Sequence, residues 1–291
     1  MIDPRLRIRS VTLGVGELGR SSDFYARVLG IPRERGDALA GTGEREAVHG
    51  PQGSPGALRL VQLERPRPAP AGSAGLFHVA WLHPTREGLA GTVRRVAGAG
   101  WRIDGASDHG VSEAIYLSDP DGLGIEIYAD RPREAWARSA DGHDIEMATL
   151  PLDLENLLAQ SPGEPGPHVE PGTAIGHVHL KVSDVDRSAA FYGERGVGFE
   201  QMARIPAAAF LAAGGYHHHV GLNSWRSRGG APAPEDAPGL KAVEFALSDA
   251  AAIDDVARQL TGIGAPVQSA DDGTGLALRD PDGQLLRFTA A

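Results

Sequence analysis

The hydrophobic positions of the chain repeat as four similar units. Residues 8–25 (IRSVTLGVGELGRSSDFY) align without a gap on residues 175–192 (IGHVHLKVSDVDRSAAFY), with eight of eighteen positions identical. The segments that start at Gly75 and Gly239 match each other in the same way, and both lead to the tetrapeptide DPDG followed by an apolar run. The pattern indicates internal repeats, which set the whole fold.

Each unit begins like a strand and continues like a helix. Apolar and polar residues alternate at positions 178–182, which is typical of a half-buried strand. Apolar residues then recur at helical spacing, as at positions 89–96 and 253–260, before a glycine. The DPDG sequences at 119–122 and 280–283 predict tight turns between strands, because proline fixes one backbone angle and glycine supplies a positive one.

We therefore expect an α+β chain built from four βαβββ modules. The predicted division is an N-terminal pair in residues 1–150 (modules 6–65 and 75–130), a linker with a short helix in 151–173, and a C-terminal pair in 174–291 (modules 174–226 and 239–291). Stretches rich in proline and glycine separate the units and support these boundaries.

The composition of the chain excludes several classes of partner and of metal site. The 291 residues carry 28 basic and 38 acidic side chains, and a net charge of -10 disfavours nucleic acid as a partner. The apolar runs are too short to cross a bilayer and the first residues do not read as a secretory signal, so we expect a cytoplasmic protein without a membrane partner. Cysteine is absent, so any metal must be held by nitrogen and oxygen.

Three residues form a candidate metal site. His78 opens the second unit, His177 opens the third at a matching place, and Glu126 lies on the closing strand of the second unit. Two imidazoles and one carboxylate are the ligand set of non-heme Fe(II) enzymes. His179 is a rival to His177, because it has the same parity on the strand. The alternative is that these histidines are ordinary core or surface residues.

The four units resemble the vicinal oxygen chelate superfamily, which includes glyoxalases, drug-binding (bleomycin) resistance proteins and extradiol dioxygenases. The resemblance rests on HVHLKVSDVDRSAAFY, which opens the third unit, and on the DPDG-to-strand close of two units. It implies that units pair into two cupped half-barrels, and that a divalent metal binds on a concave face.

The distribution of ligands predicts which units pair. Ser10 stands in the first unit where His177 stands in the third, and the fourth unit has Ala242 and Arg287 where the second has its ligands. Pairing in chain order would split the three ligands between two half-barrels. We therefore expect module 2 to pair with module 3, and module 1 with module 4.

The segment HGVSEAIYLSDPDGLGIE, residues 109–126, is similar to the motif of catechol 2,3-dioxygenase-like extradiol ring-cleavage enzymes. The resemblance implies that Glu126 is a metal ligand and that His109 and Tyr116 act in catalysis by reaching the substrate hydroxyls. The alternatives are a loop residue for His109 and a core strand residue for Tyr116.

The third unit ends in YHHHVGLNSW. If this run is a strand, one face presents His217, His219, Asn223 and Trp225, and His218 points to the other side. The extradiol resemblance implies that His219 is the acid-base residue, since imidazole titrates near neutral pH. His217, Asn223 and Trp225 are then candidate pocket residues. A surface cluster or an additional metal ligand is the alternative.

Together these features predict an extradiol dioxygenase that cleaves a small aromatic diol with O2. The resemblance implies Fe(II), with Mn(II) as the alternative, and no other cofactor. A glyoxalase-like isomerase or lyase would share the fold, as would a small-molecule (drug) binding protein, because fold alone does not define function. Homo-oligomerisation is left open by the sequence.

Overall fold

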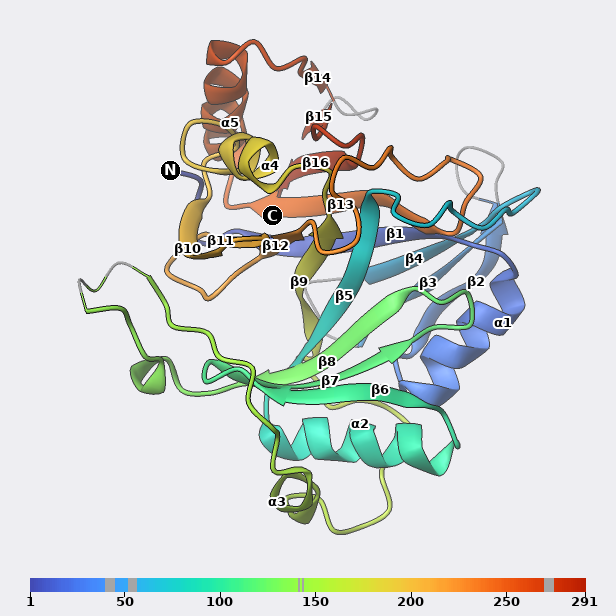
Figure 1. Cartoon of the computed structure of the whole chain (residues 1–291). Helices are drawn as coiled ribbons and strands as arrows, with labels where there is room; N and C mark the ends of the chain where they lie inside the picture. Colours follow the sequence, from blue (N-terminus) through green and yellow to red (C-terminus); the bar gives the residue numbers. More distant parts are fainter. Residues whose placement is uncertain (40–44, 52–56, 141, 143, 270–274) are drawn as a thin grey trace.

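The computed structural model describes residues 1–39, 45–51, 57–140, 142, 144–269 and 275–291, and Figure 1 shows its arrangement. Its strands are β1 (Arg7–Val15), β2 (Arg33–Leu39), β3 (Arg45–His49), β4 (Ala57–Gln62), β5 (Gly75–His83), β6 (Ile103–Asp108), β7 (Ser112–Ser118), β8 (Gly124–Asp130), β9 (Ala174–Lys181), β10 (Glu200–Ile205), β11 (Ala208–Ala212), β12 (Val220–Asn223), β13 (Gly239–Leu247), β14 (Gln268–Ser269), β15 (Gly275–Arg279) and β16 (Leu285–Ala290). Its helices are α1 (Leu18–Asp23), η1 (Phe24–Val28), α2 (Arg86–Gly98), η2 (Arg133–Ala135), α3 (Leu154–Ala159), α4 (Val185–Tyr192) and α5 (Ala250–Gly262).

The strands form two curled sheets of eight, and each sheet combines two modules. One sheet has the order β10-β11-β12-β9-β5-β8-β7-β6, and the other has the order β14-β15-β16-β13-β1-β4-β3-β2. Module 2 thus pairs with module 3, and module 1 with module 4, through the antiparallel pairs β5–β9 and β13–β1. The predicted fold and its non-sequential pairing are confirmed.

Helices follow the first strand of each module, as the periodicity predicts. Leu89, Val93 and Val96 form the buried stripe of α2, and Thr85 caps its first turn by accepting from the backbone N–H of Gly88. The short helix α3 lies in the segment between the two halves of the chain. These apolar stripes join one large core with the sheet residues that point away from the inner faces.

Two equivalent contacts fasten the half-barrels to each other, and we call them the clasps. Each clasp joins the helix of one module to the DPDG turn of the next: Tyr25 donates a hydrogen bond to Asp119 over 3.3 Å, and Tyr192 donates to Asp280 over 2.9 Å. In each clasp an arginine one turn earlier binds the second aspartate of the turn. The repeated Arg-Ser-x-x-Phe-Tyr and DPDG sequences therefore belong together in space.

Among the residues that the structure describes, none of the helices is both long and apolar enough to span a membrane.

Candidate metal and active site

The inner face of the β5–β9 sheet gathers three chemically matched side chains, and we call this face the histidine cup. His78 on β5, Glu126 on β8 and His177 on β9 have ligand atoms that all lie within 4.8 Å of one another. The register explains why they meet: Ala80 on β5 lies opposite both Glu126 and His177. All three residues are buried, at 5% exposure or less.

The polar atoms of this cluster point at one another without being fully paired. The Nε2 atom of His78 lies 2.9 Å from Glu126 Oε2, yet it makes no hydrogen bond with any of the described residues. The Nε2 atom of His177 lies 3.3 Å from the same oxygen. Buried polar atoms are normally hydrogen-bonded, so three converging donor atoms with incomplete pairing fit a cation that all of them share.

Electrostatics favours the ligand form of these groups. Burial lowers the pKa of His177 to about 4, against the pull of Glu126, which keeps the imidazole neutral. Burial alone would raise the pKa of Glu126, but the neighbouring His177 and His78 outweigh it and hold this pKa well below its usual range. A neutral imidazole and an ionised carboxylate are the forms that bind a metal.

Two more aromatic groups surround the cluster. His179 is buried, and its ring stands nearly perpendicular to that of His78 at a centroid distance of 5.0 Å. Phe77 is the extra residue of a bulge on β5, and its ring contacts both His179 and Trp225. Of the two histidines with the same parity on β9, it is His177 that lies with His78 and Glu126.

Tyr116 and His109 form a hydrogen-bonded pair beside the cluster. Tyr116 on β7 lies directly opposite Glu126 on β8, and its hydroxyl is 2.7 Å from His109 Nε2. His109 Nδ1 is 2.7 Å from the carbonyl oxygen of Ala148, so Nδ1 carries a proton, and in the neutral imidazole Nε2 then accepts from the tyrosine hydroxyl. Burial and the nearby Glu126 raise the pKa of Tyr116, which keeps it a neutral phenol.

The three consecutive histidines do not follow the alternation expected of a strand, because β12 begins only at Val220. The ring of His218 packs 4.0 Å from that of His177, although strand parity puts it on the other face. The ring of His219 instead packs against Tyr216 at a tilt of 47°, and its Nδ1 accepts a hydrogen bond from the backbone N–H of Ala213. The expected order of faces is therefore wrong for this segment.

His217 connects this segment to a carboxylate. Its Nε2 is 3.0 Å from Asp130 Oδ1, and its Nδ1 is 2.7 Å from His218 Nδ1. His217 is fully buried, whereas the Asp130 side chain is 25% exposed. The result is a hydrogen-bonded path from His218 through His217 to a partly exposed carboxylate at the end of β8.

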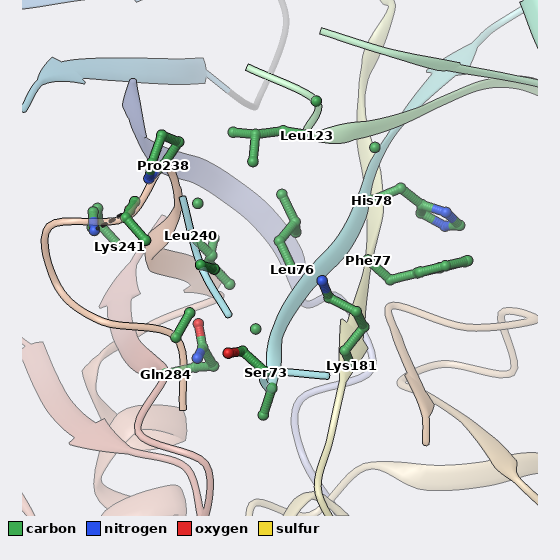
Figure 2. A pocket seen from close by; sticks show the side chains of 18 of the residues that line it. Ser73, Leu76, Phe77, His78, Leu123, Lys181, Pro238, Leu240, Lys241 and Gln284 are labelled. Carbon is green, nitrogen blue, oxygen red and sulfur yellow. Dashed lines mark hydrogen bonds between the residues drawn. The ribbon is translucent and has the colours of Figure 1, made fainter. Parts of the chain in front are cut away.

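A cavity of about 1890 Å³ adjoins the cluster and reaches both half-barrels. His78 and Tyr116 line it together with Asn223 and Trp225, while His217 is not among its lining residues. Figure 2 shows His78 and Phe77 on β5 at one side of this space. The cavity gives a substrate access to the edge of the triad.

Sequence reasoning missed several of these residues. Phe77 reaches the cup only through a bulge, and His218 only through an irregular segment, so no parity rule finds either. No sequence pattern pointed to Asp130, which forms a hydrogen bond with His217. Lys181, which also lines the cavity, could have been found, because it shares the parity of His177 on β9.

Three comparisons place the chain among known proteins. A model of the Glyoxalase/Bleomycin resistance protein/Dioxygenase superfamily matches residues 7–127 and 174–288. The catechol-2,3-dioxygenase of Bacillus subtilis strain 168 is 37% identical over 286 residues, which is 95% of this chain and 94% of that protein.

Solved structures agree on the fold. A Bacillus subtilis structure matches with a TM-score of 0.67 and 15% identity over 97% of this chain and 84% of its own. Glyoxalase I from Zea mays matches with a TM-score of 0.60 and 16% identity over 98% of this chain and 92% of its own. Repeats, sheet pairing and family match agree, and the chain belongs to the Glyoxalase/Bleomycin resistance protein/Dioxygenase superfamily.

Proposed function

We propose that this protein is an Fe(II)-dependent extradiol dioxygenase that cleaves a catechol-type ring with O2. The observation that supports this most is the convergence of His78, Glu126 and His177 on one point of the histidine cup. The 37% identity to a catechol-2,3-dioxygenase over nearly the whole chain supports the same reaction class.

In this proposal His78, Glu126 and His177 hold the metal. Two neutral imidazoles and one carboxylate suit Fe(II), and Mn(II) is the alternative for the same donors. The chemistry that such an ion supplies is to orient and polarise the diol and dioxygen. Burial of the three ligands keeps bulk water away from that chemistry.

Tyr116 and His109 position the substrate in this proposal. Because the Tyr116 hydroxyl donates to His109, its oxygen keeps lone pairs that can accept a hydrogen bond from a catechol hydroxyl. The hydrogen bond from His109 to the Ala148 carbonyl fixes the imidazole in this orientation. The pair therefore selects a diol that presents an O–H group next to Glu126.

In this proposal the histidines at 217 and 218 accept and return the proton of the catechol hydroxyl. The extradiol resemblance assigns this work to His219, but the geometry favours His218, whose ring packs on His177 and whose Nδ1 meets His217. A proton taken up at His218 can pass to His217 and towards Asp130. His219 has instead committed its Nδ1 to a backbone N–H.

A glyoxalase-like isomerase of the same fold is the second candidate, since the Zea mays glyoxalase I shares the fold. The deciding experiment is to load the protein with Fe(II) under anaerobic conditions and then add a panel of catechols in air. We expect a yellow ring-opened product with at least one catechol. Absence of any such product, with iron still bound, would move the assignment to the isomerase or to a binding protein.

A further inference from the structure

Lys181 lies on the same face of β9 as the proposed ligand His177. Positions 177, 179 and 181 share one face because β9 is regular between them. Of the two register shifts in this pairing, the one at this end falls on β5 at Phe77. Four residues of strand put Lys181 about 13 Å from His177 along β9, towards the cavity. Lysine, with its flexible four-carbon stem, can reach back towards a molecule bound at the triad.

The ammonium group of Lys181 has no partner among the residues that the structure describes. No described residue forms a hydrogen bond or an ion pair with it, although the side chain is only partly exposed and lines the cavity. Burial lowers the pKa of Lys181, because the partly desolvated ammonium group is less stable there than in water. Figure 2 shows Lys181 in the same cavity as Phe77 and His78.

A second unpaired donor stands beside this lysine. Asn223 on β12 lies directly opposite Lys181 in the parallel pair β9–β12 and is 1% exposed. Its Nδ2 atom finds no partner among the described residues, while its Oδ1 accepts from the backbone N–H of Trp225. An ammonium and a buried amide N–H that both lack acceptors form a cradle for an anion.

The side chains that line the cavity carry a net positive charge, as Lys181 does. Eight basic and four acidic side chains line it, although the chain as a whole carries 28 basic and 38 acidic residues. Lysine occurs only twice in the sequence, and Lys181 and Lys241 both line this cavity. Lys241 differs from Lys181, because its Nζ donates to the carbonyl oxygens of Glu235 and Ala237.

The other half-barrel lacks the cradle. Its register places Gly14 and Val61 where Lys181 and Asn223 stand, so two residues without side-chain donors occupy these positions. The donors are therefore a feature of the half-barrel that carries the triad, and not of the repeated fold.

We propose that Lys181 and Asn223 bind an acidic substituent of the substrate, so that the natural substrate is a catechol with a carboxylate-bearing side chain. This inference rests on the proposed function. The diol lies at the triad, and the carboxylate lies at the cavity end of β9. Trp225 and Phe77 form the aromatic wall between these two ends.

The test compares an acidic with a neutral catechol of similar size. The kcat/KM values for 3,4-dihydroxyphenylacetate and 4-methylcatechol are measured with the iron-loaded protein, Lys181→Met, Lys181→Arg and Asn223→Ala. For the acidic substrate we expect Lys181→Met to lose roughly 10- to 100-fold, mainly through KM, as for a lost charge-assisted hydrogen bond. Lys181→Arg should recover part of this loss, Asn223→Ala should show a smaller one, and the neutral substrate should change little.

Lys241→Met is the matched control and should leave the ratio between the two substrates unchanged. Equal losses for both catechols in Lys181→Met would overturn the proposal, because the lysine would then act on the diol. No loss for either would overturn it as well.

A binding measurement separates this inference from the proposed function. Acylation of Lys181 by a lysine-specific reagent is followed by peptide mass spectrometry, with Lys241 as the internal reference. We expect 3,4-dihydroxyphenylacetate to protect Lys181, and 4-methylcatechol to leave it reactive. If the protein cleaves no catechol, the proposed function fails, and this protection still decides whether Lys181 recognises the acid.

Discussion

The two half-barrels share one register but present different inner faces. In the histidine cup, Glu126 lies next to the ring nitrogen of His177, which offers a lone pair to a cation. In the other half-barrel, whose inner face we call the arginine cup, Arg287 stands at the place of Glu126 and Ser10 at that of His177. The carboxylate there, Glu244, accepts a hydrogen bond from Ser10 over 3.1 Å.

The clasps, unlike the two inner faces, are the same in both halves of the chain. Tyr25 with Asp119 and Tyr192 with Asp280 form the same contact at both junctions. The comparison teaches that the repeat preserves the residues that assemble the fold, whereas the converging set of metal-ligand atoms, among the described residues, lies in one cup. A carboxylate surrounded by lone pairs fits a cation, and a carboxylate already satisfied by donors does not.

The largest expected effect is a difference in iron content between two variants, each of which removes the carboxylate of one cup. We expect the protein to bind one catalytic iron per chain, and Glu126→Ala to lose most of it because a ligand and its charge are gone. Elemental analysis after anaerobic reconstitution measures this. Glu244→Ala is the matched control in the arginine cup and should keep its iron. Two equivalent tight sites per chain, or full occupancy in Glu126→Ala, would contradict the asymmetry of the cups.

The next effect concerns the proton within the histidine cup. His218→Ala should retain iron and lower the rate of ring cleavage roughly 10²- to 10⁴-fold, the range for a lost general acid-base group. His219→Ala should change this rate far less, because its Nδ1 serves the backbone of Ala213. Paired iron content and turnover of the two variants check this. The reverse order of the two variants would return the acid-base role to His219.

The smallest effect tests the clasps. Burial, and to a lesser degree the neighbouring Asp282, raises the pKa of Asp280 to about 6, and burial raises that of Asp119 to about 6. A carboxyl group whose folded pKa is raised contributes stability that is present below its unfolded value of 3.8 and is lost as pH rises through about 6. Each ionised carboxylate therefore lowers the stability of the folded protein at neutral pH, because its charge is buried.

The side chain of the Asp280→Asn variant stays neutral. Its free energy of unfolding, relative to that of the unmodified protein, should therefore rise by about 1.4 kcal/mol from about pH 5 to about pH 7.5. Asp119→Asn should change in the same direction, since the clasps are equivalent. Thermal or urea unfolding at the two pH values measures the difference, with the exposed Asp254→Asn as control. A gain confined to one clasp would show that the two junctions are not alike.

Much of the fold followed from patterns within short segments. The repeats at 8–25 and 175–192 and the two DPDG turns predicted four modules, and counting ligands predicted how they pair. These inferences succeed because strand and helix periods are local properties of the chain. The gathering of His78, Glu126 and His177 followed in the same way, from parity and repeat alignment.

Other features depended on the tertiary structure. A bulge turns Phe77 into the cup, and an irregular turn before β12 brings His218 to His177, while the ring of His219 packs against Tyr216. Such departures from alternation depend on how neighbouring strands pack, which the local pattern does not contain.

By itself, then, the sequence determined the repeats, the modules and the residues that can bind a metal. Only the tertiary structure decided which histidine packs on His177. It also decided that Lys181 and Asn223 lie on adjacent strands, where the lysine Nζ and the asparagine Nδ2 have no partner among the described residues. The physical reason is that a group is unpaired only with respect to everything around it. Those surroundings come from segments far apart in the chain, and they exist only once the sheets have closed.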